Sequence, residues 1–249
     1  MNRVAAITFD LDGTLIDSAH GVMLALNAAF AASGLPQFDF PTVRGWIGDG
    51  PDALIRRALD ECHRHDVDPL RLRRLFDAAT MDDPRAQGQA YEGIAEVLAR
   101  WAGRYPMAVV TNKPTPLARA VLDAAGLLGW FSGVHGADTP AQRKPLPLLI
   151  QQAAARLGLA PKSLLMVGDG EADLKAAAAA GCRAAWVAWG YGSESALLPL
   201  VCTLRTPEEL DNYIHQNFTG DPSCRPEAVQ LSRSSSSRNA ASTPRPLEI

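Results

Sequence analysis

The sequence predicts an α/β protein with a mostly parallel sheet, helices on both faces of that sheet and an inserted α-helical domain. Short, nearly continuous apolar runs recur along the chain, which is typical of strands buried on both faces. Segments with helical periodicity separate these runs, and the alternation indicates βαβ units. One long segment, residues 18–89, lacks a buried-strand pattern and interrupts the alternation.

The core elements follow in chain order. Four apolar runs predict strands at Val4–Phe9, Met107–Val110, Leu164–Val167 and Ala184–Val187. Helical periodicity predicts helices at Pro116–Ala125, Leu146–Leu157 and Glu171–Ala180. The last of these is followed by Gly181, at the position where a glycine commonly ends a helix.

The interrupting segment contains three predicted helices, His20–Ala32, Asp52–Cys62 and Leu70–Thr80. In the second of them an apolar stripe lies beside charged residues, as in a helix with one buried face. The stripe consists of Leu54, Ile55, Ala58 and Leu59. We therefore predict a helical cap domain over residues 18–89, between the two core segments 1–17 and 90–218.

Composition excludes several classes of partner. The chain has 249 residues, of which 47% are hydrophobic, and a net charge of −3. Basic and acidic residues are interspersed without a large block of one sign, so nucleic acid is not expected as a partner. No apolar run reaches the roughly 18–20 residues that span a bilayer. Arg3 is soon followed by Asp10 and Asp12, which interrupts any signal-peptide segment.

The cysteines and the last residues carry two further expectations. Cys62, Cys182, Cys202 and Cys224 lie far apart without C-x-x-C spacing, so neither a disulfide framework nor a zinc site is expected. A reducing cytoplasm is the predicted location. Residues 219–249 are rich in serine, proline and arginine, a composition that predicts a disordered tail.

A pair of carboxylates directly follows the first predicted strand. Asp10 and Asp12 stand two residues apart, followed by Gly13 and Thr14. In parallel α/β sheets, ligands bind just beyond the carboxyl ends of the strands. Two carboxylates at that point are costly unless a cation joins them. A turn with surface aspartates is the alternative interpretation.

A second acidic pair follows the third strand. Asp169 and Asp173 are four residues apart at a loop-to-helix junction and can lie on one side of it. Hard oxygen ligands of this kind suit Mg²⁺. A favourable charge at the helix N-terminus is the simpler interpretation of Asp173 alone.

Neutral and basic groups are predicted at the same sheet edge. Thr111 and Asn112 end the second strand, and Lys144 lies in a loop before a helix. An ammonium among carboxylates neutralises an anion. The alternatives are helix capping for Thr111 and Asn112 and a solvated surface lysine for Lys144.

In this order the motifs resemble those of the haloacid dehalogenase superfamily of phosphatases, from residue 4 to about residue 192. The resemblance implies a Rossmann-like core with a mobile helical cap inserted after the first motif. One departure is Gly170, which stands where relatives usually have Ser or Thr.

The resemblance also implies residue roles. Asp10 is expected to form an aspartyl-phosphate, and Asp12 to act as the general acid and then as the base. The phosphoryl oxygens are expected to contact Thr111, Asn112 and Lys144, with Lys144 also catalytic. The implied Mg²⁺ ligands are Asp10, the main-chain carbonyl of Asp12, Asp169 and Asp173.

A cap loop adds a clue to the substrate. Gly48, Asp49 and Gly50 resemble the cap loop of the phosphoglycolate phosphatases within the superfamily, although an ordinary turn before a helix explains them equally well. The resemblance implies that the loop and a cap arginine meet a substrate carboxylate. Arg44, Arg56 and Arg57 are the candidates, and Arg57 is the one we predict.

The predicted function is Mg²⁺-dependent hydrolysis of a small phosphomonoester, with 2-phosphoglycolate as the first candidate. A sugar-phosphate phosphatase, a phosphomutase of the same family and a non-catalytic phosphate-binding protein are the alternatives. Asp12 speaks against dehalogenation, because a halide leaving group needs no proton. No lysine lies between Ser18 and Gln89, which excludes an imine-forming cap. The protein is expected to be a monomer or a homodimer.

Overall fold

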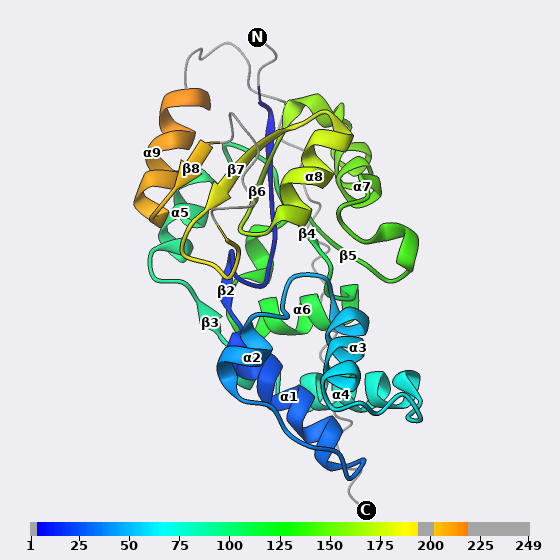
Figure 1. Ribbon diagram of the computed structural model, residues 1–249. Coiled ribbons are helices and arrows are strands. Elements are labelled where there is room, and N and C mark those ends of the chain that lie inside the picture. Colours follow the sequence, from blue (N-terminus) through cyan, green and yellow to red (C-terminus); the bar gives the residue numbers. More distant parts are fainter. Residues whose placement is uncertain (1–3, 194–201, 219–249) are drawn as a thin grey trace, which may run out of the picture.

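A computed structural model describes residues 4–193 and 202–218 (Figure 1). The strands are β1 (Ala6–Phe9), β2 (Ile16–Asp17), β3 (Gln89–Ala90), β4 (Met107–Thr111), β5 (Gly133–Gly136), β6 (Leu164–Gly168), β7 (Arg183–Val187) and β8 (Cys202–Leu204). The helices are α1 (Ala19–Ala31), α2 (Phe40–Arg44), α3 (Pro51–Glu61), α4 (Pro69–Asp82), α5 (Ile94–Trp101), α6 (Thr115–Ala124), α7 (Leu148–Arg156), α8 (Glu171–Ala180) and α9 (Pro207–Phe218).

The core is one six-stranded sheet with the order β5-β4-β1-β6-β7-β8, and every neighbouring pair is parallel. This confirms the predicted α/β fold. β1 lies between β4 and β6, with Thr8 opposite Ala108 on one side and Met166 on the other. The carboxyl ends of these three strands therefore meet at one point of the sheet edge, which is where the candidate site lies.

Two apolar layers cover the sheet. On one face, Ile7 and Val109 belong to a cluster with side chains of α5, α6 and α9. On the other face, Ala6 and Met166 belong to a cluster with side chains of α7 and α8. Successive strand residues point to opposite faces, so strands covered on both sides must be apolar throughout, as the sequence is here.

The helices α1 to α4 lie between β2 and β3 in the chain and beneath the carboxyl end of the sheet in Figure 1. They share an apolar cluster of their own, which includes Leu26, Phe30, Ile55 and Leu72. β2 and β3 pair antiparallel and form the two-stranded ribbon that connects these helices to the core. The division of the chain at residues 18 and 89 into core and cap stays a prediction.

Most element boundaries differ from the predicted ones by one or two residues. β1 begins at Ala6 rather than Val4, and α7 begins at Leu148 rather than Leu146, with Pro147 at its N-cap position. The patterns did not reveal the strands β2, β3, β5 and β8 or the helices α2, α5 and α9. β5 is a half-buried edge strand with two glycines, so it has no apolar run to recognise.

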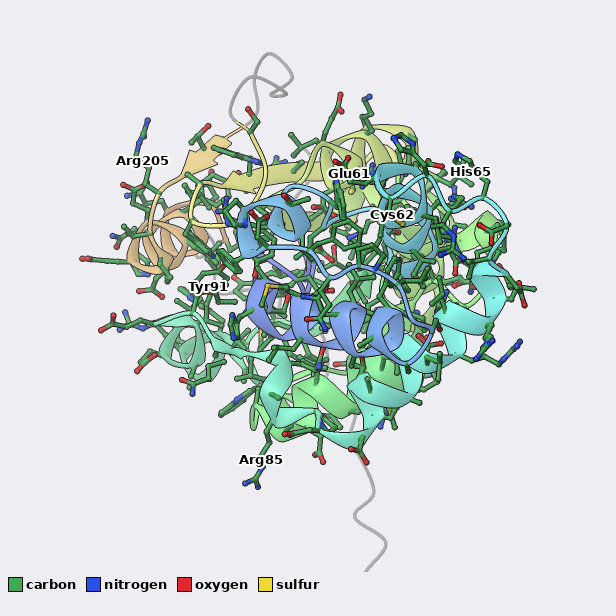
Figure 2. The ribbon with its side chains drawn as sticks, turned by 60° about the horizontal axis from the view of Figure 1, so that its bottom comes forward. Glu61, Cys62, His65, Arg85, Tyr91 and Arg205 are labelled. Carbon is green, nitrogen blue, oxygen red and sulfur yellow. The ribbon has the colours of Figure 1, made fainter. Side chains whose placement is uncertain are left out.

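Three further expectations concern the cysteines, membrane-spanning helices and the C-terminal tail. Cys62, Cys182 and Cys202 are free thiols, and Cys62, labelled in Figure 2, is partly buried against the apolar cluster of the helical region. Across residues 4–193 and 202–218, no helix combines the length and apolarity needed to cross a bilayer. The predicted disordered tail, with Cys224, lies outside the described residues.

Candidate active site

The loop after β1 places the first pair of carboxylates. Asp10 follows the strand directly and is almost fully buried, and the loop returns through a turn in which Leu15 N donates to Leu11 O. Gly13 has a φ of +85°, and a Cβ there would lie 2.4 Å from Asp169 Oδ2. Glycine is therefore required for both the turn and the close approach of the second acidic loop.

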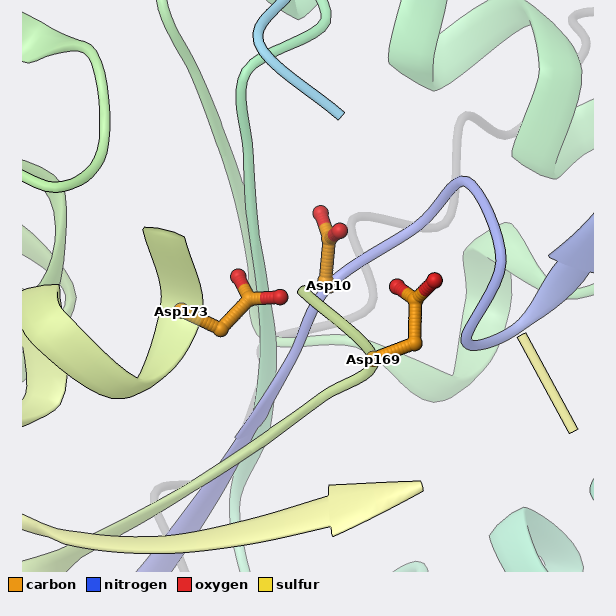
Figure 3. Close-up of side chains that lie close together, drawn as sticks. All are labelled: Asp10, Asp169 and Asp173. Carbon is orange, nitrogen blue, oxygen red and sulfur yellow. The ribbon is translucent and has the colours of Figure 1, made fainter. Parts of the chain in front are cut away.

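Asp169 and Asp173 lie on either side of Asp10 (Figure 3). Asp169 is in the loop after β6, and Asp173 is in the first turn of α8. One carboxylate oxygen from each of Asp10, Asp169 and Asp173 lies within 4.8 Å of the other two, and all three residues are buried. The structure thus brings together the acids predicted from separate motifs.

Asp169 is held from three sides. Its Oδ1 accepts from Thr14 Oγ1 at 3.2 Å. Its Oδ2 accepts from the main-chain amides of Tyr191 and Gly192, at 2.7 Å and 3.3 Å. A Cβ at Gly190 would meet Asp169 at 2.4 Å. The loop after β7 therefore fixes this carboxylate, a role that the sequence alone did not indicate.

Lys144 is the cation of the cluster, not a surface residue. Its side chain is 1% exposed, and Nζ lies 2.8 Å from Asp10 Oδ1 and 2.6 Å from Asp173 Oδ1. Nζ also donates to Val110 O at 2.9 Å. Nζ thus donates hydrogen bonds to Asp173 and Val110, whereas its contact with Asp10 is an ion pair and Asp10 Oδ1 accepts no hydrogen bond. In this arrangement Lys144 fixes the carboxylate of Asp10 rather than reaching outward.

Burial shifts the acidity of all three carboxyls. It raises the pKa of Asp10 to about 7, against the opposing charge of Lys144, and the pKa of Asp169 to about 6. Burial also raises the pKa of Asp173. One ammonium among three buried carboxylates leaves an excess of negative charge, which a divalent cation would balance. The donor set is all oxygen, as Mg²⁺ requires.

Asp12 is held by a residue that we did not predict as functional. Lys113 Nζ lies 2.9 Å and 3.0 Å from the two Asp12 carboxylate oxygens, and Ser18 Oγ donates to Asp12 Oδ1 at 2.6 Å. The Lys113 side chain is only 5% exposed. The signal was available, since Lys113 follows Thr111 and Asn112 directly and the chain has only four lysines.

Thr111 and Asn112 lie at the end of β4, where the sequence predicted them. Asn112 Nδ2 donates to Gly48 O at 3.0 Å and to Lys144 O at 3.2 Å, and its Oδ1 accepts from Lys144 N at 2.8 Å. The Asn112 side chain is therefore fully engaged in joining the cap loop to the Lys144 loop. Thr111 is buried, and its Oγ1 accepts from Lys113 N.

Two of the three predicted cap-loop residues line the cavity, and the third does not. Gly48 and Gly50 line the cavity above Asp10. Asp49 instead pairs with Arg57, which also donates to Trp46 O at 2.7 Å. Arg57 therefore stabilises the cap loop through these two contacts and does not line the cavity.

The cavity between the cap helices and the sheet edge has a volume of about 40 Å³, enough for only a few water molecules. Its lining combines the polar sheet-edge groups with an apolar cap wall. The lining residues are Asp10, Asp12, Val22, Ile47, Gly48, Gly50, Pro51, Leu54, Phe76, Thr111, Asn112 and Lys113.

Comparison with known families agrees with this geometry. The model of the haloacid dehalogenase-like hydrolases matches residues 4–181. The chain therefore belongs to this family of hydrolases, and the resemblance seen in its motifs is confirmed.

Relatives within the family include several phosphatases. The phosphoglycolate phosphatase of Yersinia pseudotuberculosis is 36% identical over 197 residues, which cover 78% of this chain and 85% of that protein. A predicted phosphoglycolate phosphatase from Haemophilus somnus superposes with a TM-score of 0.76 at 30% identity, over 86% of this chain and 99% of that one. CbbY from Rhodobacter sphaeroides, solved with xylulose-(1,5)bisphosphate, has a TM-score of 0.71 at 25% identity, over 83% and 96%. These similarities identify the chain as a phosphatase of the family.

Proposed function

We propose that this protein is a Mg²⁺-dependent phosphomonoester hydrolase that forms an aspartyl-phosphate on Asp10. The observation that carries the proposal is the buried cluster of Asp10, Asp169, Asp173 and Lys144 at the carboxyl end of the central strands. A carboxylate that a lysine orients toward a cavity is suited to nucleophilic attack. Burying these charged side chains costs more free energy than their packing alone returns, so the cluster indicates a function.

The proposed Mg²⁺ ligands are Asp10, the main-chain carbonyl of Asp12, Asp169 and Asp173. Their convergent carboxylate oxygens and excess negative charge suit a divalent cation. Bound there, the ion would neutralise phosphoryl oxygens and orient the phosphate.

The proposed reaction has two displacements. Asp10 attacks phosphorus, the ester P–O bond breaks, and Asp12 donates a proton to the leaving alkoxide oxygen. Asp12 then takes a proton from water, which attacks the phosphorus of the acyl phosphate and releases phosphate and the Asp10 carboxylate. Dividing one difficult displacement in two is the advantage of covalent catalysis.

The phosphate is proposed to meet two donors at the end of β4 and the charge of Lys144. The hydroxyl of Thr111 can donate to a phosphoryl oxygen while it accepts from Lys113 N. The side chain of Asn112 is engaged elsewhere, so its main-chain amide is the proposed donor. Lys144 contributes its charge, which offsets the negative charge that builds up near Asp10.

We propose 2-phosphoglycolate as the substrate. Curated relatives at 34–36% identity are named phosphoglycolate phosphatases, and the cavity lies between the helices α1 to α4 and the sheet edge that carries Asp10. Gly48 and Gly50 line the cavity and are proposed to contact the substrate from the cap. A sugar phosphate is the alternative, because a structural neighbour was solved with a sugar bisphosphate. The cytoplasmic location stays a prediction.

Steady-state phosphate release tests the proposal. The panel would set 2-phosphoglycolate beside triose, hexose and nucleoside phosphates, each with Mg²⁺ and with EDTA. We expect the highest kcat/KM for 2-phosphoglycolate and loss of turnover in EDTA. Preference for a sugar phosphate would keep the Asp10 chemistry and overturn the substrate. A burst of one equivalent without steady release would indicate a phosphomutase, and no turnover at all a phosphate-binding protein.

A further inference from the structure

Lys113 occupies a special position in the cavity. Among the described residues that line it, Lys113 carries the only positive charge, since Lys144 lies behind Asp10 outside the lining. The side chain of Lys113 is 5% exposed, and its Nζ contacts both carboxylate oxygens of Asp12. A lysine is seldom buried in this way unless it has an anionic partner.

This pair conflicts with the task proposed for Asp12. The acid must turn a carboxyl oxygen toward the leaving alkoxide, but both of its oxygens face the Lys113 ammonium and Oδ1 also accepts from Ser18. An anion that competes for Lys113 would release Asp12. A substrate with a second negative group brings such an anion into the cavity.

The cap arginines do not provide this recognition. Arg44 donates to Gly190 O at 3.0 Å and stacks on Tyr191, and Arg57 is paired with Asp49. Arg56 is exposed on the surface of α3. None of these three side chains lines the cavity, so among the described lining residues Lys113 is the one cation left to meet the substrate carboxylate.

We propose that Lys113 binds the carboxylate of the substrate, and that its transfer from Asp12 to this carboxylate lets Asp12 take a proton from solvent and donate it to the leaving oxygen. In 2-phosphoglycolate the carboxylate carbon is two covalent bonds from the leaving oxygen. An ammonium in contact with Asp12, the residue that protonates that oxygen, is therefore within reach of the carboxylate. Binding of the substrate carboxylate by Lys113 then both selects the substrate and frees Asp12 to act as the general acid. The inference rests on the proposed function and names its specificity residue.

The test compares two substrates that differ at one group. 2-Hydroxyethyl phosphate replaces the carboxylate of 2-phosphoglycolate with a neutral CH₂OH. We would measure kcat/KM for both in the wild type, in Lys113→Met and in the matched control Lys162→Met, which removes an exposed lysine. Removing one partner of a buried charged contact costs enough to lower the ratio of the two kcat/KM values about 100-fold in Lys113→Met. The control should change it less than about threefold.

The outcomes separate the inference from the function. Equal loss on both substrates in Lys113→Met, with the ratio unchanged, would show that Lys113 only holds Asp12 and would overturn the inference. A wild type that hydrolyses other phosphomonoesters but does not prefer 2-phosphoglycolate to 2-hydroxyethyl phosphate would overturn the proposed substrate instead.

If Lys113→Met does not fold, the signals of isotope-labelled lysines test whether Lys113 recognises the substrate carboxylate. The chain has only four lysines, so ¹³Cε-lysine labelling of the inactive Asp10→Asn protein gives four signals. Lys162→Arg and Lys175→Arg assign the two exposed ones. We expect one buried-lysine signal to shift with both phosphate esters and a second to shift only with 2-phosphoglycolate. Identical responses to the two ligands would refute the recognition of the carboxylate by Lys113.

Discussion

The Nζ atom of Lys144 lies 2.8 Å from Oδ1 of Asp10, and both side chains are almost completely buried. This contact joins the loop after β1 to the loop before α7, which are more than a hundred residues apart in the chain. It orients the proposed nucleophile and places a positive charge beside three carboxylates.

Lys144→Met should lower kcat roughly 100- to 1000-fold, the usual effect of removing one preorganised charge partner. The physical reason is that Asp10 loses both its orientation and its neutralising charge. Steady-state phosphate release measures it, with Lys162→Met as the control of equal chemistry at an exposed site. A kcat within about threefold of the wild type would contradict the role of Lys144.

Stability of the Mg²⁺-free protein should decrease as the pH rises from about 4 to about 7. The pKa values of Asp10 and Asp169 are raised from 3.8 to about 7 and about 6. In this range the folded protein therefore binds more protons at these groups than the unfolded chain does, and the free energy of unfolding falls. Thermal unfolding in EDTA at several pH values measures the effect, and Asp10→Asn should reduce it. A midpoint that rises over this range would be inconsistent with the raised pKa values.

Magnesium should reverse this loss. A ligand present at 100 times its Kd adds about 2.7 kcal/mol, which corresponds to a rise of roughly 5–10 °C for a domain of this size. The rise should be larger at about pH 7.5 than at about pH 5, because protonated carboxyls do not bind the ion. Equal or absent shifts at both pH values would argue against a metal site at Asp10, Asp169 and Asp173.

Ion pairs between the cap and the core should favour substrate binding. Asp52, in the first turn of α3, pairs with Arg143 of the core and with Arg73 of α4, and Arg73 also contacts Asp77 at 2.8 Å. Arg143 directly precedes Lys144. These partly buried contacts hold the cap against the sheet edge, so Asp52→Asn should raise KM about fivefold, an effect of about 1 kcal/mol. kcat should stay within about twofold.

The salt dependence of KM is the companion measurement. In the wild type, KM should rise with ionic strength because salt screens the cap–core pairs, and in Asp52→Asn this rise should be smaller. Asp60→Asn, which removes an exposed cap carboxylate far from the core contact, is the matched control. A lower KM in Asp52→Asn would mean that the pairs oppose binding.

Two glycines near the acids should respond oppositely to substitution. A Cβ at Gly170 would meet its nearest atom, Asp173 Oδ2, at 3.4 Å, whereas one at Gly190 would lie 2.4 Å from Asp169 and from Gly13 O. Gly170→Ser supplies an N-cap hydroxyl to α8 and should stabilise the protein by a few tenths of a kcal/mol, about 1 °C. Gly190→Ala should displace Asp169 and lower kcat at least about tenfold. Melting curves and steady-state rates of both variants check this, and an active, stable Gly190→Ala protein would contradict the packing.

The parallel sheet and the positions of the acids could be predicted because they depend on local patterns. Ile7, Val109 and Val167 belong to apolar runs that only doubly covered strands require. Asp10 and Asp169 each follow such a run, and the parallel arrangement then brings them to one edge. The edge strand β5 gave no such signal because it is half-buried and has a glycine at each end.

The contacts between loops could not be predicted in the same way. The position of Lys113 after Thr111 and Asn112 indicates that it lies at the sheet edge, but not that its partner is Asp12. Nothing local indicates that Tyr191 N and Gly192 N hold Asp169. Such pairs depend on how loops from different strands meet, which no periodicity encodes. The position of Arg57 could not be predicted for the same reason, because its partner Asp49 belongs to the turn before α3 and does not line the cavity.

Trapping the covalent intermediate tests the central proposal most directly. Borohydride reduces an acyl phosphate to an alcohol, so protein quenched during turnover of 2-phosphoglycolate with Mg²⁺ should contain homoserine at position 10. Peptide mass spectrometry identifies the modified residue, with Asp10→Asn as the control. We predict homoserine at position 10 of the wild-type chain and at no other aspartate. Active enzyme that shows no reduced residue, or that carries it at Asp12 instead, would contradict the assignment of Asp10 as the nucleophile.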